Sequence, residues 1–188
     1  MLRAEERLKL VVPLTLVIIL VLLYIYFKNF TESFMVLGTV PLALVGAFWT
    51  ILWLDYNLSV AVGVGLIALA GLSAEFGVVM LVYLDQAVRE HRPTDLRSLR
   101  KAIIEGAVLR VRPKAMTAAV IIAGLIPIMI GSGTGSEVMQ RIAAPMLGGM
   151  ITAPLVSMFL IPVLYTLWKA RELKRTGRIA VENMPGFV

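Results

Sequence analysis

Long runs of apolar residues, separated by short polar segments, make up most of the chain. Five such runs cover residues 10–27, 34–54, 56–84, 115–136 and 142–168. A helix rises about 1.5 Å per residue, so roughly 20 apolar residues cross the hydrocarbon core of a bilayer, which is about 30 Å thick. The pattern therefore predicts an all-α membrane protein, with a bundle of five transmembrane helices over residues 10–168 embedded in the lipid bilayer.

The composition supports a membrane protein and excludes several kinds of site. Of the 188 residues, 59% are hydrophobic and 16% are charged, whereas soluble domains are about 45–50% apolar and about 25% charged. The chain has no cysteine, which excludes a disulfide framework, a thiolate zinc site and a cysteine nucleophile. A single histidine, His91, leaves no histidine-based metal cluster.

Basic residues gather in the segments that a five-span topology places on one side. The connection 85–113 and the tail 169–188 are rich in Lys and Arg, whereas the connections 55–58 and 131–137 contain neither. The positive-inside rule therefore predicts a cytoplasmic loop at 85–113, a cytoplasmic C-terminal tail and an extracytoplasmic lead-in at residues 1–9. Orientation explains the net charge of +6, and no motif for nucleic acid accompanies it, so no nucleic-acid partner is expected.

Within the predicted cytoplasmic loop, apolar residues recur at helical spacing. Leu96, Leu99 and Ile103 predict a short helix over residues 95–109, with Arg and Lys on its other faces. Such a helix could lie along the cytoplasmic membrane interface. An ordinary solvated connector is the alternative, and the sequence favours neither.

Glu75 lies inside the third apolar run, ten residues before Asp85. Ten residues of helix are about 15 Å long, which places its carboxyl group near the middle of the bilayer. A charge there costs on the order of 3 kcal/mol, so the group must be protonated, paired or facing water, and each state makes it a candidate proton carrier. Ala68 and Gly71 share its face, where small residues would let another helix approach. The alternative is a neutral acid that only hydrogen-bonds a neighbouring helix.

Lys114 opens the fourth run, directly after Arg112 and Pro113. On spacing alone, a side chain that reaches back to the cytoplasmic interface is slightly favoured. Because Arg112 can serve as that anchor, Lys114 could instead turn inward, with Thr117 one turn further along as part of a polar track. If Lys114 and Glu75 both face the interior of the bundle, they could form a titratable network whose protonation drives a helix shift.

The connection between the last two runs is rich in glycine, and methionines follow it. Residues 131–136 read as a turn on the outer side, because they follow a membrane span and lack the lysine of a phosphate-binding loop. Met139, Met146 and Met150 lie along the fifth run, and their thioethers are soft ligands for ions such as Cu(I). Methionine is also a common filler of apolar packing, which is the more frequent role.

Three motifs in order resemble a known family. They are AGLSAEFGVVM at 70–80, GAVLRVRPKAMT at 106–117 and GSEVMQRIAAPMLGGM at 135–150. Together they resemble the last five transmembrane helices of heavy-metal efflux pumps of the resistance–nodulation–division superfamily, most of all its copper/silver branch. The resemblance extends to about residue 175, and residues 176–188 match nothing in it.

The resemblance implies a function that hydropathy alone does not. Members of the family are secondary active transporters rather than enzymes: trimeric proton antiporters of the bacterial inner membrane that work with a periplasmic adaptor and an outer-membrane channel. The resemblance implies that Glu75 and Lys114 belong to a proton relay, with Lys114 facing inward. Thr117 is a further candidate member of this relay. The resemblance also implies that Met139 is a stepping stone for Cu(I) or Ag(I), the transported ions, with no cofactor.

The resemblance covers only part of such a pump. It implies that seven earlier spans, two periplasmic segments and an aspartate of the relay lie outside this chain, so that the missing half of the pump is a partner and the chain alone should not complete a transport cycle. Two other functions stay open. One is a membrane scaffold that does not transport, and the other is a relative that transports organic substrates.

Overall fold

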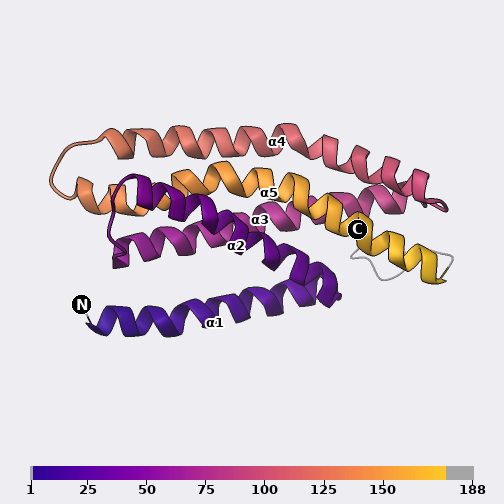
Figure 1. Cartoon of the computed structure of the whole chain (residues 1–188), viewed down its shortest axis with the longest axis horizontal. Coiled ribbons are helices and arrows are strands. Elements are labelled where there is room, and N and C mark those ends of the chain that lie inside the picture. The colour runs from indigo at the N-terminus through magenta and orange to yellow at the C-terminus, as the bar shows by residue number, and fades with distance from the viewer. Residues whose placement is uncertain (1, 177–188) are drawn as a thin grey trace.

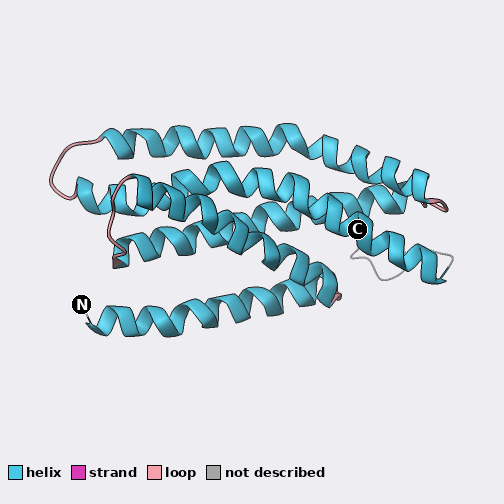
Figure 2. Cartoon of the chain, in the orientation of Figure 1, coloured by secondary structure: helices cyan, strands magenta, loops and turns pink. Residues whose placement is uncertain are grey.

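The computed structural model describes residues 2–176, with the side chains of residue 11 and of residues 13–174, and within this part the chain is helical with no strand (Figures 1 and 2). The helices are α1 (Leu2–Phe27), α2 (Phe30–Trp53), α3 (Val60–His91), α4 (Leu96–Ile130) and α5 (Ser136–Thr176). They run side by side as a bundle, and α1 lies along its edge (Figure 1). The predicted all-α bundle is confirmed.

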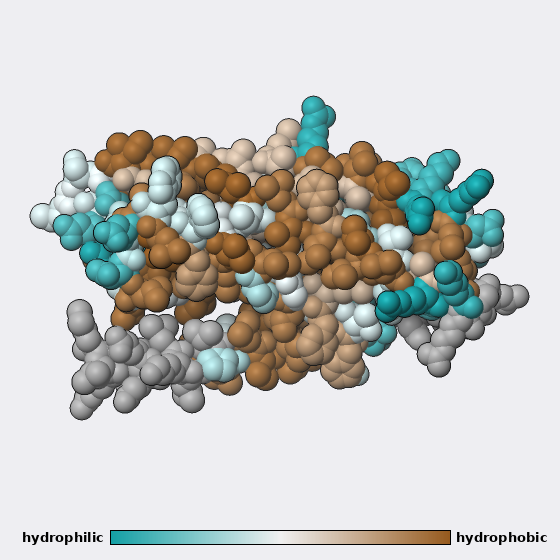
Figure 3. Space-filling view, in the orientation of Figure 1, coloured by the Kyte–Doolittle hydropathy of each residue, from teal (hydrophilic) through white to brown (hydrophobic). Residues whose placement is uncertain are grey.

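Four of the five helices, α2 to α5, are long and apolar enough to cross a membrane. In α1 the described apolar part is shorter and covers Pro13–Phe27. On the face that Figure 3 shows, hydrophobic residues cover the middle of the bundle and hydrophilic residues gather toward its two ends. The turns at 28–29 and 92–95 lie at one end, and those at 54–59 and 131–135 lie at the other (Figure 1).

The helices extend beyond the predicted spans, which changes the connections. Because α3 continues to His91 and α4 begins at Leu96, most of the predicted loop 85–113 is helical. Asp95 caps α4 through a capping box with Ser98. The segment 95–109 is helical, as predicted, but it continues without a break into the span instead of forming a separate interfacial helix. Charged residues end an apolar run without ending a helix, which explains the difference.

The same extension occurs at both ends of the chain. Residues 2–9, predicted as a lead-in, already belong to α1, and α5 continues past the predicted start of the tail at residue 169 as far as Thr176. The rest of the predicted tail, residues 177–188, lies outside the described residues.

Helix α5 is the centre of the bundle and packs against α2, α3 and α4. It crosses α2 closely, because a Cβ atom on Gly148 would collide with Thr50 and with the carbonyl oxygen of Gly46. Across the same crossing, the hydroxyl of Thr152 donates to the carbonyl oxygen of Ala43 at 3.0 Å. Small residues and interhelical hydrogen bonds are the usual means of packing helices in a bilayer.

Candidate functional site

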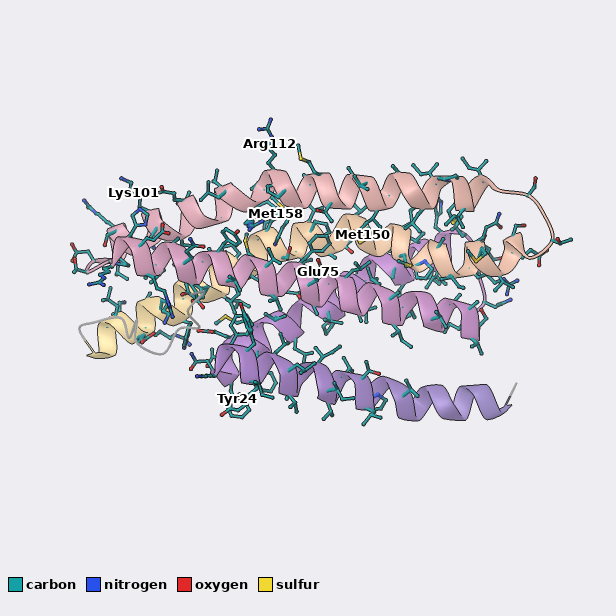
Figure 4. All side chains as sticks on the ribbon, turned by 180° about the vertical axis from the view of Figure 1, so that it is seen from behind. Tyr24, Glu75, Lys101, Arg112, Met150 and Met158 are labelled. Carbon is teal, nitrogen blue, oxygen red and sulfur yellow. The ribbon has the colours of Figure 1, made fainter. Side chains whose placement is uncertain are left out.

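Lys114 turns into the bundle. Its side chain is 3% exposed, and its Nζ atom donates to the hydroxyl of Ser157 on α5 at 2.9 Å. That hydroxyl donates in turn to the carbonyl oxygen of Pro154 at 2.9 Å. The neighbouring Arg112 is exposed and points away from the bundle (Figure 4). The structure therefore places Lys114 inward and Arg112 outward.

The surroundings of Lys114 are mostly apolar. The ring of Phe76 on α3 lies with its centre 6.0 Å from Nζ. Phe76 also packs in a buried cluster with Ala43, Ala118, Met150 and Ala153. Burial of a charge among apolar side chains is unfavourable unless it is compensated. Ser157 supplies a hydrogen bond but no negative charge, so this amine is only partly compensated within the described residues.

Glu75 lies on α3, midway along the bundle (Figure 4). It is exposed, together with Ala68 and Gly71 on the same face, and a Cβ atom on Gly71 would meet nothing within 4 Å. The expectation that these residues share a face holds, and this face is left uncovered by the described helices. Within the described part of the chain, no hydrogen bond or ion pair reaches the Glu75 carboxylate.

Glu75 and Lys114 lie on neighbouring helices but face different surroundings. Phe76, the residue after Glu75, is the one that faces the Lys114 amine. Lys114 points toward α5, whereas Glu75 points to the surface of the described bundle. Among the described residues the two side chains form no salt bridge, so the titratable network that they could form is not closed by this segment alone.

Thr117 does not share the environment of Lys114. Its side chain is exposed, and its hydroxyl donates to the carbonyl oxygen of Pro113 on the same helix at 3.1 Å. The residue that continues the buried face of Lys114 is Ala118. The structure therefore does not extend the polar contact of Lys114 along α4 through Thr117.

The three methionines of α5 differ in position and burial. Met139 is 52% exposed and lies beside the glycine-rich turn 131–135, in a shallow surface hollow that this turn helps to form. Met150 is fully buried near the middle of the bundle (Figure 4), and Met146 is half-buried. Among the described residues there is no group of three or more His, Cys, Asp or Glu side chains that could hold a metal ion. A metal contact at Met139 would therefore rest on its thioether.

Sequence reasoning missed Ser157 as the partner of Lys114. A signal was present, since a hydroxyl inside an apolar span is one of the few groups that can satisfy a buried amine. Thr152 and Thr166 also lie in this span, and their hydroxyls donate to backbone carbonyls. Only the helix packing distinguishes Ser157 from them.

Comparisons with known proteins agree with this arrangement. The sequence model described as the AcrB/AcrD/AcrF family matches residues 1–169. The chain is 56% identical over 180 residues to the cation efflux system protein CusA of Escherichia coli K12, and 54% identical over 178 residues to the SilA protein of Salmonella typhimurium. It is 35% identical over 164 residues to the cobalt-zinc-cadmium resistance protein CzcA of Cupriavidus metallidurans.

These matches cover most of this chain and a small part of each relative. They include 92%, 91% and 87% of this chain but 17%, 17% and 15% of CusA, SilA and CzcA, respectively. A crystal structure of a heavy metal efflux pump superposes on 90% of this chain with a TM-score of 0.79 and 36% sequence identity, over 16% of that pump. The chain therefore spans about a sixth of the length of the relatives that it matches.

Proposed function

Because the chain belongs to the AcrB/AcrD/AcrF family, we propose that it supplies part of the transmembrane domain of a proton-driven heavy-metal efflux pump. The observation that carries this proposal is the inward lysine at position 114, buried at the level of Phe76 and held by Ser157. A buried ionisable group inside a membrane bundle is costly, and such groups usually mark ion or proton pathways. The similarity to CusA and SilA supports the same conclusion.

In the proposed mechanism, Glu75 and Lys114 bind and release protons in turn. Lys114 stays inside the bundle through its bond to Ser157, while Glu75 faces outward from α3. A carboxylate supplied by another part of the pump would complete the relay and compensate the positive charge of Lys114. Loss or gain of a proton changes the charge between the helices, and a change of charge at a packed interface can drive a shift between two arrangements. Thr117 would act from the outer side of α4.

The uncovered face around Glu75 is where we place the missing half of the pump. Ala68 and Gly71 leave room beside the carboxyl group, which suits the close approach of another helix. The whole assembly would be a trimer in the bacterial inner membrane, joined to a periplasmic adaptor and an outer-membrane channel. The basic end of the bundle, with the turn at 92–95 and the end of α5, would face the cytoplasm.

We propose copper(I) and silver(I) as the exported ions. Sequence identity to CusA and SilA is 54–56%, against 35% to CzcA. Met139 lies exposed at the opposite end from the basic turn, where a thioether could accept a soft ion on the periplasmic side.

A chimera tests the transport function directly. In it, the matching segment of E. coli CusA is replaced by this chain, and the protein is produced in cells that lack their own copper/silver pump. We expect the chimera to restore growth on copper and silver, Glu75→Gln and Lys114→Met each to abolish it, and Met139→Ile to weaken it. Lys101→Met is the matched control, because Lys101 is an exposed lysine of the same helix (Figure 4).

Each result decides between the proposed functions. If Glu75→Gln and Lys114→Met retain full tolerance at equal membrane levels, the proton relay is wrong. If the chimera reaches the membrane at normal levels but confers no tolerance, the chain is better explained as a scaffold without transport. Tolerance that never depends on Met139 removes the thioether path.

A further inference from the structure

A second group of ionisable side chains is buried in this bundle, away from Lys114. Glu32 of α2, Asp85 of α3 and Tyr165 and Lys169 of α5 are each no more than 3% exposed. They lie toward the end of the bundle that carries the turns at 28–29 and 92–95. Asp85 is ten residues after Glu75, which is about 15 Å along α3. This cluster, termed here the Glu32–Asp85 cluster, is thus separate from the proposed relay.

The contacts inside the cluster leave two carboxylate oxygens without a partner. The hydroxyl of Tyr165 donates to Oδ1 of Asp85, and the side-chain amide of Asn29 donates to Oε1 of Glu32 at 3.4 Å. Oδ2 of Asp85 and Oε2 of Glu32 are buried and accept no hydrogen bond within the described residues. Unpartnered buried oxygens on two carboxyl groups are unusual, because burial without a hydrogen bond is costly.

The one buried cation of the cluster already has a carboxylate partner. Nζ of Lys169 lies 3.0 Å from Oε2 of Glu172, one turn further along α5, and 4.2 Å from the centre of the Trp168 ring. Electrostatic interactions link Lys169 with both Glu32 and Asp85, but its hydrogen bond goes to Glu172. Lys169 therefore cannot compensate three carboxylates by itself.

The remaining described neighbours supply no hydrogen bond to the two unpartnered oxygens. Arg89 of α3 acts electrostatically on Asp85, and Asp85 in turn acts on Tyr26 of α1. The Nε atom of Arg89 is buried without a hydrogen-bond partner among the described residues. From α4, the side chains packed into the adjoining hydrophobic cluster are Leu99 and Ile103, which are uncharged. Within the described residues, Glu32 and Asp85 thus share Lys169, whose hydrogen bond goes to Glu172, and Asp85 also faces Arg89. Neither cation donates a hydrogen bond to the two unpartnered oxygens.

We propose that the Glu32–Asp85 cluster is a second proton-binding site, in which the two acids together hold one proton at neutral pH. A proton neutralises one of the two buried acids and turns its carboxyl group into a hydrogen-bond donor. The alternative, two ionised carboxylates with buried unpartnered oxygens, would be strongly unfavourable. Proton binding here is a property of the folded chain and does not depend on transport. A role of the Glu32–Asp85 cluster as the cytoplasmic exit of a proton pathway rests on the proposed function.

Infrared spectroscopy of the 188-residue chain in lipid nanodiscs at pH 7 tests the proposal. A protonated carboxylic acid has a C=O stretching band that a carboxylate lacks. All variants carry Glu75→Gln, so that no signal from the proposed relay contributes. We expect this parent to show an acid band, which Glu32→Gln or Asp85→Asn shifts or removes and the double variant abolishes. Glu137→Gln, which alters an exposed glutamate at the other end of the bundle, should leave the band unchanged.

The outcomes separate this proposal from the transport function. A parent chain without an acid band at pH 7, or a band that survives in both Glu32→Gln and Asp85→Asn, overturns the second site whatever the chimera does. If Glu32→Gln and Asp85→Asn fail to fold, as judged by circular dichroism, Tyr165→Phe is decisive. It keeps both acids and removes the donor to Asp85, so the band must persist at a shifted frequency. An unshifted band overturns the proposal.

Discussion

Two lysines are buried in the described part of the bundle, and they are compensated in different ways. Lys114 on α4 donates to the neutral hydroxyl of Ser157, and the charged group that acts on it is another cation, Arg110. Lys169 on α5 pairs with Glu172 at 3.0 Å and lies against the face of Trp168. Both side chains are almost fully buried, so burial alone does not distinguish them.

The difference indicates which lysine stabilises the fold and which one is available for chemistry. A buried cation with a carboxylate and an aromatic face is stabilised in place, and its removal takes away favourable interactions with both. A buried amine with only a hydroxyl gains little stability from its charge, so a functional reason for retaining it is needed. Removing the two lysines should therefore change the free energy of unfolding very differently.

The largest effect on stability is expected for Lys169→Met. The substitution removes the buried cation that acts on the buried acids Glu32 and Asp85 and pairs with Glu172, and loss of one partner from a buried charge pair costs about 3 kcal/mol. We expect the free energy of unfolding to fall by about that amount, measured by denaturant titration of the chain in detergent micelles. Lys174→Met is the control, because Lys174 is exposed on the same helix. An effect no larger than that of Lys174→Met would show that Lys169 is not structural.

The next largest effect is expected for Tyr165→Phe. The tyrosine is fully buried, and its hydroxyl donates to Asp85. Phenylalanine keeps the ring and its packing but removes the hydroxyl that donates to Asp85, which costs about 2 kcal/mol. The same titration measures this loss, with the exposed Tyr24→Phe for comparison. No loss at all would mean that Asp85 finds another donor.

A smaller effect is expected for Ser157→Ala, which removes the hydrogen-bond partner of Lys114. A hydrogen bond of this kind contributes about 1 kcal/mol, so the free energy of unfolding should fall by that amount. Ser73→Ala is a matched control, since Ser73 is also fully buried but its hydroxyl has no hydrogen-bond partner in the described structure. Equal effects of the two substitutions would show that the bond to Lys114 contributes nothing.

The sequence predicts those features of the structure that depend on neighbours along the chain, and it predicts poorly those that depend on contacts between helices. The helices follow from apolar runs, because hydropathy and length decide membrane insertion locally. The face shared by Ala68, Gly71 and Glu75 follows from helical spacing alone. Hydropathy could not predict that α4 runs without a break from Leu96 into the membrane span. Hydropathy shows where an apolar run ends, but a helix can continue beyond that point.

The buried charges depend on contacts between helices, which the sequence pattern does not contain. Asp85 and Lys169 follow apolar runs and therefore read as the start of a loop and of a tail. They are buried because α5 continues past its apolar part and brings Tyr165 beside Asp85. For Lys114, spacing left both the inward and the outward position open. The family resemblance favoured the inward one, and Ser157 on another helix is what holds it there.

The smallest effect on stability is expected for Lys114→Met, and it is the sharpest test of the comparison. Methionine has nearly the length of lysine and no charge to bury, and Ser157 keeps its own bond to the carbonyl oxygen of Pro154. Replacing a buried charge by an apolar group of similar volume is often neutral or stabilising, so the free energy of unfolding should change by less than about 1 kcal/mol or rise. Unfolding titrations of Lys114→Met and Lys169→Met side by side measure the difference. A loss at Lys114 as large as that at Lys169 would make both lysines structural, and the loss of transport in the chimera would then no longer identify Lys114 as part of a relay.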